Sequence, residues 1–186
     1  RSEFQSLGVE LPEGAEVLTY VSRCFEEYRG FPQVMDIIAK LQSLRPNLHF
    51  LLVGTDGTAY GPPRSDGKPW SEWSKSNFDL DPHRVHWLGS LQEDDYHKVL
   101  SVSDVHLYLT IPFILSWSFL EAMASGCKII ASKTQPVAEV SEHNISALHV
   151  DFYDVDGFVN QVLRVLDDKK LSDSLSLGAM KAAQNY

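Results

Sequence analysis

Two arginines near the start of the chain have the chemistry of an anion site. Arg23 and Arg29 flank a short polar segment that follows a run of β-branched and aromatic residues, and Gly30 comes directly after the second arginine. Guanidinium groups offer planar donors to phosphate oxygens, and the start of a helix adds a positive dipole end. The pair therefore predicts a diphosphate site, unless both side chains instead pair with Glu26 and Glu27 on the surface.

A single carboxylate lies in the apolar stretch 107–132. Glu121 is the only charged residue between Ile111 and Gly126, and a buried carboxylate is costly unless hydrogen-bond donors surround it. Those donors could be two neighbouring hydroxyls of a ligand, such as a ribose 2′- and 3′-OH pair. They could also belong to the protein, as backbone amides or as the hydroxyl of Ser132. Glu121 is thus expected to have a partner, from either source.

The turn before Glu121 offers a second anion site. The backbone amides of Leu115, Ser116 and Trp117 come at the start of a helix expected at 117–125, where they have no acceptor within the helix. Such amides bind anions readily. Ser116 or Ser118 could instead cap the helix, and the two interpretations can hold together.

Alternating strand and helix patterns are expected to position these groups. Short β-branched runs predict strands, and segments with apolar residues at helical spacing predict helices between them. The strands are expected at 16–22, 47–54, 84–88, 104–110, 128–132 and 147–150, and the helices at 32–43, 70–76, 92–102, 117–125, 156–166, from 171 to the end, and one ending at 142. This order predicts an α/β fold with a Rossmann-like parallel sheet of about six strands and helices on both faces. Ligands of such sheets bind at the carboxyl ends of the strands, where the groups above are expected.

Length and charge limit the function. A chain of 186 residues, 44% hydrophobic, is long enough for one sizeable core, and we expect residues 15–186 to form the domain and 1–14 to be a linker or an added remnant. The net charge of -9 argues against nucleic acid or an anionic membrane surface as the main partner. The chain has no Walker loop, no GxGxxG motif and no metal-ligand spacing among its histidines, which disfavours P-loop hydrolysis and dinucleotide redox chemistry. Two isolated cysteines and the lack of a signal peptide favour a cytoplasmic location.

Taken in order, these features resemble the C-terminal, donor-binding domain of family 4 glycosyltransferases with the GT-B fold. The similarity runs from about Val17 to the end of the chain. The segments that carry it are the basic pair, Gly30, LLVG ending at Gly54, RVHWLG ending at Gly89, SDVHLYL, LEAMASG ending at Gly126, and PVAEV. The combination is specific, although each segment is weak by itself.

The resemblance implies a retaining hexosyltransferase that uses a nucleotide-sugar, with UDP or GDP as the nucleotide, and needs no metal or other cofactor. Arg23 and Arg29 would be the catalytic residues that contact the diphosphate, and Glu121 would bind the ribose hydroxyls. The remaining donor-binding residues would be Gly30, Gly54, Leu88, Gly89, Leu115, Ser116 and Trp117, with the base against the loop at Leu88 and Gly89. The expected partners are the nucleotide-sugar and an N-terminal acceptor domain that this chain lacks.

Without that acceptor domain, the chain alone is expected to bind the donor and not to turn over. The resemblance further implies cell-surface polysaccharide synthesis and peripheral membrane association through the absent domain.

Two positions depart from the family pattern. A Glu-x7-Glu motif would place its first carboxylate at 113, where the chain has Phe113, and Arg29 stands where lysine is usual. The missing carboxylate normally contacts sugar hydroxyls. Two alternatives therefore stay open: a non-catalytic nucleotide-sugar binding or interaction module, and a GT-B nucleotide-sugar epimerase. The epimerase is disfavoured because suitable acids and histidines are absent around the inferred site.

Overall fold

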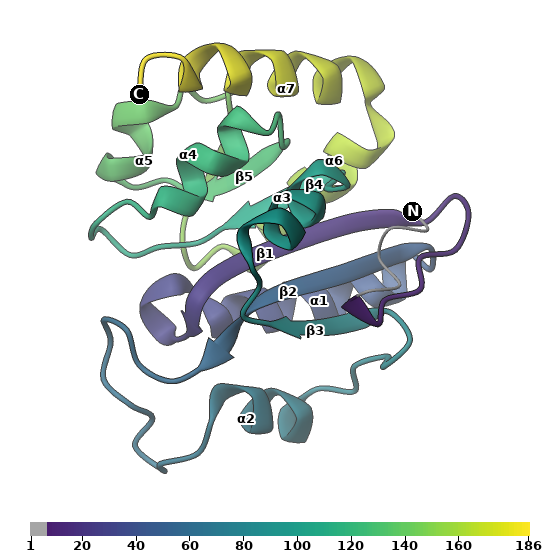
Figure 1. Cartoon of the computed structure of the whole chain (residues 1–186), viewed down its shortest axis with the longest axis vertical. Helices are drawn as coiled ribbons and strands as arrows, with labels where there is room; N and C mark the ends of the chain where they lie inside the picture. Colours follow the sequence, from purple (N-terminus) through teal and green to yellow (C-terminus); the bar gives the residue numbers. More distant parts are fainter. Residues whose placement is uncertain (1–6) are drawn as a thin grey trace.

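The computed structural model describes residues 7–186, which fold around one parallel sheet of six strands (Figure 1). The strand order is β3-β2-β1-β4-β5-β6, and each neighbouring pair runs parallel. The strands are β1 (Glu16–Phe25), β2 (Leu48–Asp56), β3 (Val85–Gly89), β4 (Val105–Tyr108), β5 (Ile129–Ser132) and β6 (Leu148–Val150). The predicted Rossmann-like fold class is confirmed.

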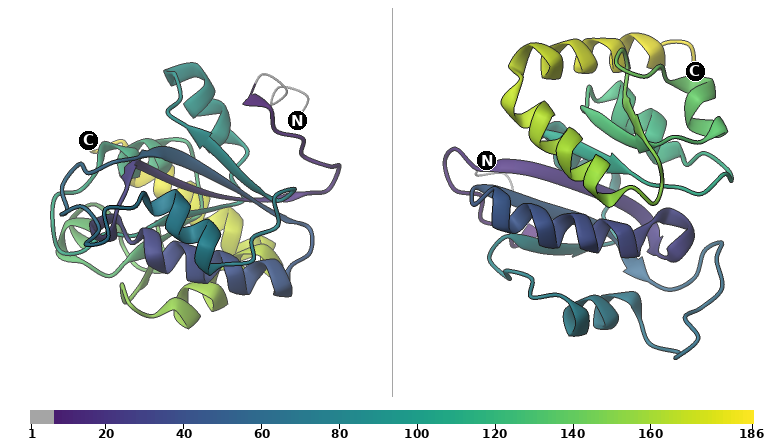
Figure 2. Two further views of the ribbon diagram at one scale, coloured as in Figure 1. Left: turned by 90° about the horizontal axis from the view of Figure 1, so that it is seen from below. Right: turned by 180° about the vertical axis from the view of Figure 1, so that it is seen from behind.

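Helices cover both faces of the sheet, as predicted. They are a single 3-10 turn η2 (Glu27–Arg29), α1 (Phe31–Leu44), α2 (Trp70–Asn77), α3 (Glu93–Ser101), α4 (Trp117–Ala124), α5 (Gln135–Val140), α6 (Val155–Asp167) and α7 (Lys169–Ala183). Helices α1 and α6 pack side by side on one face, whereas α3 and α4 lie on the other (Figure 2). Buried apolar side chains form one cluster on the side of α1 and α6 and two on the side of α3 and α4, so the sheet is the centre of a three-layer core.

The first strand is three residues longer than predicted. Residues up to Phe25 belong to β1, because the Phe25 ring packs against Phe31 at 4.6 Å and against Trp87 at 5.6 Å between ring centroids. The polar sequence that follows Ser22 predicts a loop, but burial of one aromatic side chain keeps the backbone extended. Arg23 consequently lies inside a strand.

A bulge in β1 explains a glycine in its neighbour. The pairing of β1 with β2 shifts register between Val21 and Cys24. Gly54, predicted to end β2, lies within that strand with φ at 148°, and a Cβ atom there would sit 2.5 Å from the carbonyl oxygen of Ser22. Gly54 is therefore needed where two backbones approach closely, and the strand continues beyond its predicted end at Gly54, to Asp56.

The segment before the domain also packs on the sheet. Residues 1–6 lie outside the described part of the chain, while Val9 is buried against Val17 and Leu51. Part of the expected linker thus covers the face of β1 and β2. The domain boundary at 14 and 15 stays a prediction.

Candidate functional site

Two of the groups singled out in the sequence, Arg29 and the turn before α4, come together at the carboxyl ends of β1 and β4. The two strands are neighbours, paired in parallel from Leu18 with Val105 to Tyr20 with Leu107. The turn that follows β1 therefore lies beside the segment that follows β4. This places Arg29 next to the stretch 108–117, although about 80 residues separate them along the chain.

Arg29 is a buried cation that no carboxylate neutralises within residues 7–186. Only 5% of the residue is exposed. Its Nη1 atom donates to the hydroxyls of Thr110 at 2.9 Å and Tyr108 at 3.2 Å, and the guanidinium carbon lies 5.1 Å from the centroid of the Tyr60 ring. The backbone is also fixed, because the Tyr20 hydroxyl donates to the Arg29 carbonyl at 2.9 Å. A buried charge is costly without a counter-ion, so this arrangement suits an anionic ligand.

Further donors remain on the same guanidinium. The N–H groups on Nε and Nη2 have no partner among the described residues, whereas both hydrogen bonds above use Nη1. A guanidinium presents its donors as a planar fork that matches two phosphate oxygens. Arg29 can therefore donate two hydrogen bonds to an anion, from Nε and Nη2, while it keeps its hydrogen bonds to Tyr108 and Thr110.

Arg23 is placed differently from the prediction. It is exposed within β1 and does not flank a loop, and in the described part of the chain its side chain has no ion-pair partner. Neither arginine pairs with Glu26 or Glu27, so the alternative of surface ion pairs is wrong as well. Arg23 is an exposed cation near the end of the same strand.

The Glu26 carboxylate has a role that the sequence did not indicate. Glu26 is 1% exposed, and its Oε2 atom accepts hydrogen bonds from the amides of Ala59 at 3.3 Å, Tyr60 at 3.0 Å and Gly61 at 2.9 Å. Backbone amides grouped in this way stabilise a buried negative charge. Glu26 thus attaches the loop after β2 to the turn after β1, and holds Tyr60 over Arg29.

Three aromatic side chains form a cover beside Arg29. The Phe113 ring lies 5.3 Å from Tyr60 and 6.3 Å from Tyr28 between centroids, in edge-on geometries. We call Tyr28, Tyr60 and Phe113 the aromatic cover. Phe113 occupies the position where a carboxylate was expected, so this side of the site is apolar instead of acidic.

The start of α4 is both capped and linked to Arg29. The Ser118 amide donates to Ser116 Oγ, which confirms the predicted cap. The Ser116 amide donates to the Tyr108 hydroxyl at 2.8 Å, and this is the hydroxyl that also accepts from Arg29. Burial raises the pKa of Tyr108, so the hydroxyl stays neutral.

Two of the three predicted amides remain available at this helix start. Those of Leu115 and Trp117 have no partner among residues 7–186. Because Tyr108 joins Ser116 to Arg29, these amides and the guanidinium belong to one connected group of donors. The role of Tyr108 was not predicted from the sequence, because the pattern around it indicates only an apolar residue of a strand.

Glu121 has a protein partner. Its Oε2 atom accepts a hydrogen bond of 2.9 Å from the hydroxyl of Tyr96, in α3. The alternative partner, Ser132, makes no hydrogen bond to Glu121; its Oγ atom accepts from the Thr110 amide at 3.0 Å. The expectation that this carboxylate needs a donor is confirmed, and the donor is a residue that the sequence did not single out.

The remaining predicted residues are glycines and an apolar side chain. Gly30 has φ at 66°, precedes α1, and approaches Leu109 so closely that a Cβ atom would lie 2.5 Å from the leucine Cβ. Leu88 and Gly89 are the last residues of β3 and not part of the loop after it. Leu88 is half-buried against the cluster that contains Val17 and Leu51, and Gly89 has φ at 64°.

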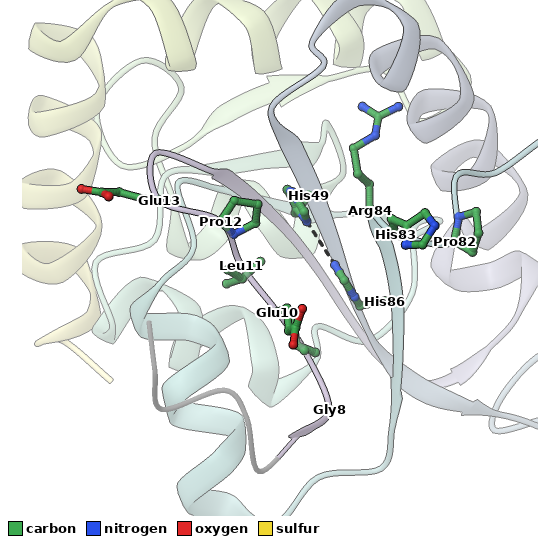
Figure 3. Close-up of a pocket in the computed structure, with 11 residues that line it drawn as sticks. Gly8, Glu10, Leu11, Pro12, Glu13, His49, Pro82, His83, Arg84 and His86 are labelled. Carbon is green, nitrogen blue, oxygen red and sulfur yellow. Dashed lines mark hydrogen bonds between the residues drawn. The ribbon is translucent and has the colours of Figure 1, made fainter.

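A hollow of about 1210 Å³ lies elsewhere, at the amino ends of β2 and β3 (Figure 3). Figure 3 shows His49 and His86 side by side in its lining, joined by a hydrogen bond of 3.1 Å between Nδ1 and Nε2. None of the predicted site residues lines this hollow. Its position is opposite to the edge at which parallel sheets bind ligands, so its size alone does not make it the site.

The described residues contain neither a cluster of metal-ligating side chains nor a helix that could span a membrane. Within the described residues, no three His, Cys, Asp or Glu side chains converge as metal ligands would. Independence from metal stays a prediction. None of the helices in residues 7–186 combines the length and the apolar character that a membrane span requires.

Comparison with solved structures agrees with this fold. The Anabaena protein Alr3699/HepE in complex with UDP-glucose superimposes with a TM-score of 0.81 at 20% identity, over 99% of this chain and 47% of that one. Sucrose-phosphate synthase from Thermosynechococcus elongatus gives 0.75 at 23% identity, over 98% and 43%. The C-terminal domain of the group 1 glycosyl transferase LpcC from Francisella tularensis gives 0.78 at 13% identity, over 99% and 90%. The chain thus spans less than half of the first two proteins and nearly all of the isolated domain.

Sequence comparison identifies the family. By sequence alone no curated protein matches the chain. The family model described as glycosyl transferases group 1, however, matches residues 2–181, which is nearly the whole length. This protein chain belongs to the group 1 glycosyl transferase family.

Proposed function

We propose that the chain is the nucleotide-sugar-binding domain of a family 4 glycosyltransferase, which transfers a hexose to an acceptor with retention of configuration and without a bound metal. The observation that carries this proposal is Arg29: a buried guanidinium with unpaired N–H groups, linked through Tyr108 to the start of α4. A nucleoside diphosphate supplies the anion that such a site lacks.

The same donors would assist the chemistry. When the bond between sugar and diphosphate breaks, negative charge grows on the departing diphosphate. Arg29 and the amides of Leu115 and Trp117 are fixed before the reaction, so they would stabilise that charge without reorganisation. Arg23 would add an exposed positive charge nearby, with an effect that salt weakens.

Glu121 would bind the ribose. One of its oxygens already accepts from Tyr96, and a carboxylate has room to accept further hydrogen bonds from neighbouring hydroxyls. The solved relatives support this class of donor, because Alr3699/HepE was crystallised with UDP-glucose, with UDP, and with UDP and glucose. UDP is therefore the first nucleotide to test, with GDP as the alternative.

The acceptor would bind mainly outside this chain. The longer relatives contain roughly as much chain again beyond the matched part, and we assign the acceptor site to an N-terminal domain of the same polypeptide. This chain alone would then bind the donor without turnover. We further propose that the full-length protein is a cytoplasmic enzyme of cell-surface polysaccharide synthesis. Its other domain would hold it at the membrane.

A second candidate is a nucleotide-sugar binding module without catalysis. The aromatic cover favours it: Tyr60 lies over the guanidinium of Arg29, and Phe113 replaces an expected carboxylate. Turnover of a labelled donor by the full-length protein separates the two candidates, because the module would bind the donor and leave it intact.

Calorimetric titration of the chain with UDP, GDP and ADP tests the binding itself. We expect one of them to bind, and Arg29→Ala to weaken that binding by at least tenfold. Arg29→Lys, which keeps the charge but loses the fork, should give an intermediate loss. Arg164→Ala is the matched control, since this arginine of α6 is exposed and, among residues 7–186, its side chain hydrogen-bonds only to Gln161 on its own helix. A folded chain that binds none of the three nucleotides contradicts the proposal.

A further inference from the structure

The hydrogen bond between Tyr96 and Glu121 joins two helices on the same face of the sheet. Tyr96 lies in the first half of α3, which follows β3, and Glu121 lies in the middle of α4, which follows β4. The tyrosine hydroxyl donates to Oε2 of the carboxylate at 2.9 Å. Both side chains are partly buried, so the contact is neither a surface ion pair nor a fully enclosed core contact.

The direction of this hydrogen bond is fixed. Burial, and then the hydrogen bond to Glu121, raise the pKa of Tyr96, so that its hydroxyl keeps its proton. A carboxylate can only accept. Tyr96 therefore always donates, and it holds one oxygen of Glu121 in a single position while the other, Oε1, has no partner among residues 7–186.

The helices do not depend on this contact for their packing. Helix α3 is anchored by Val99 and Leu100, and α4 by Phe119 and Met123, all at most 1% exposed. The ring of Tyr96 adds apolar contact with the cluster around α4. Removing only the hydroxyl leaves these contacts in place, so its specific effect falls on the orientation of the Glu121 carboxylate.

We propose that Tyr96 is a positioning residue for ribose recognition: by fixing Oε2, it directs Glu121 to accept from the 2′-hydroxyl of a ribonucleoside diphosphate. The inference rests on the proposed function, in which Glu121 binds the ribose. It adds that the chain discriminates ribonucleotides from 2′-deoxyribonucleotides, and that part of this discrimination comes from a side chain that does not touch the ligand. Without the Tyr96 hydroxyl, the carboxylate of Glu121 would be free to rotate. It would keep its charge but lose the geometry of its hydrogen bond with the ribose.

Titration with UDP and 2′-deoxy-UDP tests the inference. We expect wild type to bind UDP at least tenfold more tightly than 2′-deoxy-UDP, and Glu121→Ala to bring this ratio close to one. Tyr96→Phe should lower the ratio by about threefold to fivefold and leave the affinity for 2′-deoxy-UDP unchanged. Tyr186→Phe is the matched control, because it also removes a tyrosine hydroxyl, one that donates to the Glu139 carbonyl at 3.1 Å and not to Glu121.

The outcomes separate this inference from the proposed function. If wild type binds UDP and Tyr96→Phe weakens both ligands equally, or keeps the wild-type ratio, Tyr96 has a structural role and the positioning role is refuted. The same holds if wild type binds both ligands with equal affinity. If wild type binds neither UDP, GDP nor ADP, the proposed function fails and the positioning role fails with it.

Discussion

The Oε2 atom of Glu26 accepts a hydrogen bond of 2.9 Å from the amide of Gly61, and so joins the turn after β1 to the loop after β2. The same oxygen accepts from the amides of Ala59 and Tyr60. One buried carboxylate thus sets the position of the loop that carries Tyr60 over Arg29. The conformation of the candidate site depends on a residue that takes no part in the proposed chemistry.

Replacing Glu26 by alanine is expected to release this loop. The three amides lose a charged acceptor, and a hydrogen bond to a charged group is worth about 1.5–3 kcal/mol. We expect the free energy of unfolding to fall by about 2 kcal/mol, and the amides of Tyr60 and Gly61 to exchange with deuterium at least tenfold faster. Glu27→Ala is the control, because this neighbouring glutamate is exposed. Unchanged exchange at both amides would show that other contacts hold the loop.

Phe113→Glu restores the carboxylate that the family pattern expects. The variant loses edge-on contacts with Tyr28 and Tyr60, and we expect a stability loss of about 1 kcal/mol from them. The new carboxylate can accept hydrogen bonds from sugar hydroxyls, so the affinity for UDP-glucose should rise several-fold relative to that for UDP. Phe113→Leu, which removes the ring without adding charge, controls for the lost packing. If the ratio of the affinity for UDP-glucose to that for UDP is the same in wild type and both variants, position 113 does not contact the sugar.

Gly30→Ala tests the close approach of the site turn to Leu109. The glycine has φ at 66°, and an added Cβ atom would lie 2.5 Å from the Leu109 Cβ. Gly67 provides a matched control, because its φ is 71° but no atom lies within 4 Å of an added Cβ. Gly67→Ala should cost about 1 kcal/mol for backbone conformation alone. Gly30→Ala should cost about 1–3 kcal/mol more because of the overlap, as measured by urea unfolding. Equal losses of stability in the two variants would mean that the turn at Gly30 shifts enough to remove the overlap with Leu109.

His106 is expected to make the fold sensitive to acid. Ser103 Oγ donates to the Val105 carbonyl, so it accepts from Thr19, whose hydroxyl oxygen in turn accepts from Nδ1 of His106. Burial lowers the pKa of His106 from 6.5 to about 4, so at neutral pH the imidazole is neutral and carries its proton on Nδ1. The unfolded chain takes up a proton below pH 6.5, whereas the folded chain does so only near pH 4, so stability falls as the pH drops between these values.

The size of this effect follows from the same pKa shift. Between pH 7.5 and 5.0, His106 should cost about 2 kcal/mol of the free energy of unfolding. His106→Asn keeps an amide donor for Thr19 but does not titrate, so it should lose about 2 kcal/mol less than wild type over this interval in urea unfolding. His86, whose pKa burial also lowers to about 4, remains in both proteins and cancels in the comparison. An identical pH dependence of the two proteins would contradict the neutral assignment.

The predicted elements fail mainly where packing overrides local pattern. The alternation of strands and helices is confirmed throughout, because each segment shows an apolar pattern of its own. The start of helix α1 just after Gly30 could be predicted from the sequence, because a glycine is followed there by a proline in the first turn of the helix. The end of β1 was misplaced because Phe25 is held by Phe31 and Trp87, and no local pattern shows a contact with residue 87.

The sequence by itself determined the parallel sheet, the edge at which the candidate site lies, and the need of Glu121 for a partner. These properties depend on periodicity and composition over short windows. The identity of each partner was decided only by the tertiary structure: Tyr96 for Glu121, Tyr108 and Thr110 for Arg29, and the loop amides for Glu26. The partners of Arg29 are 79 and 81 residues away in the chain. Such pairs form because β1 and β4 lie side by side in the sheet, and strand order is a property of the packed core that no single segment contains.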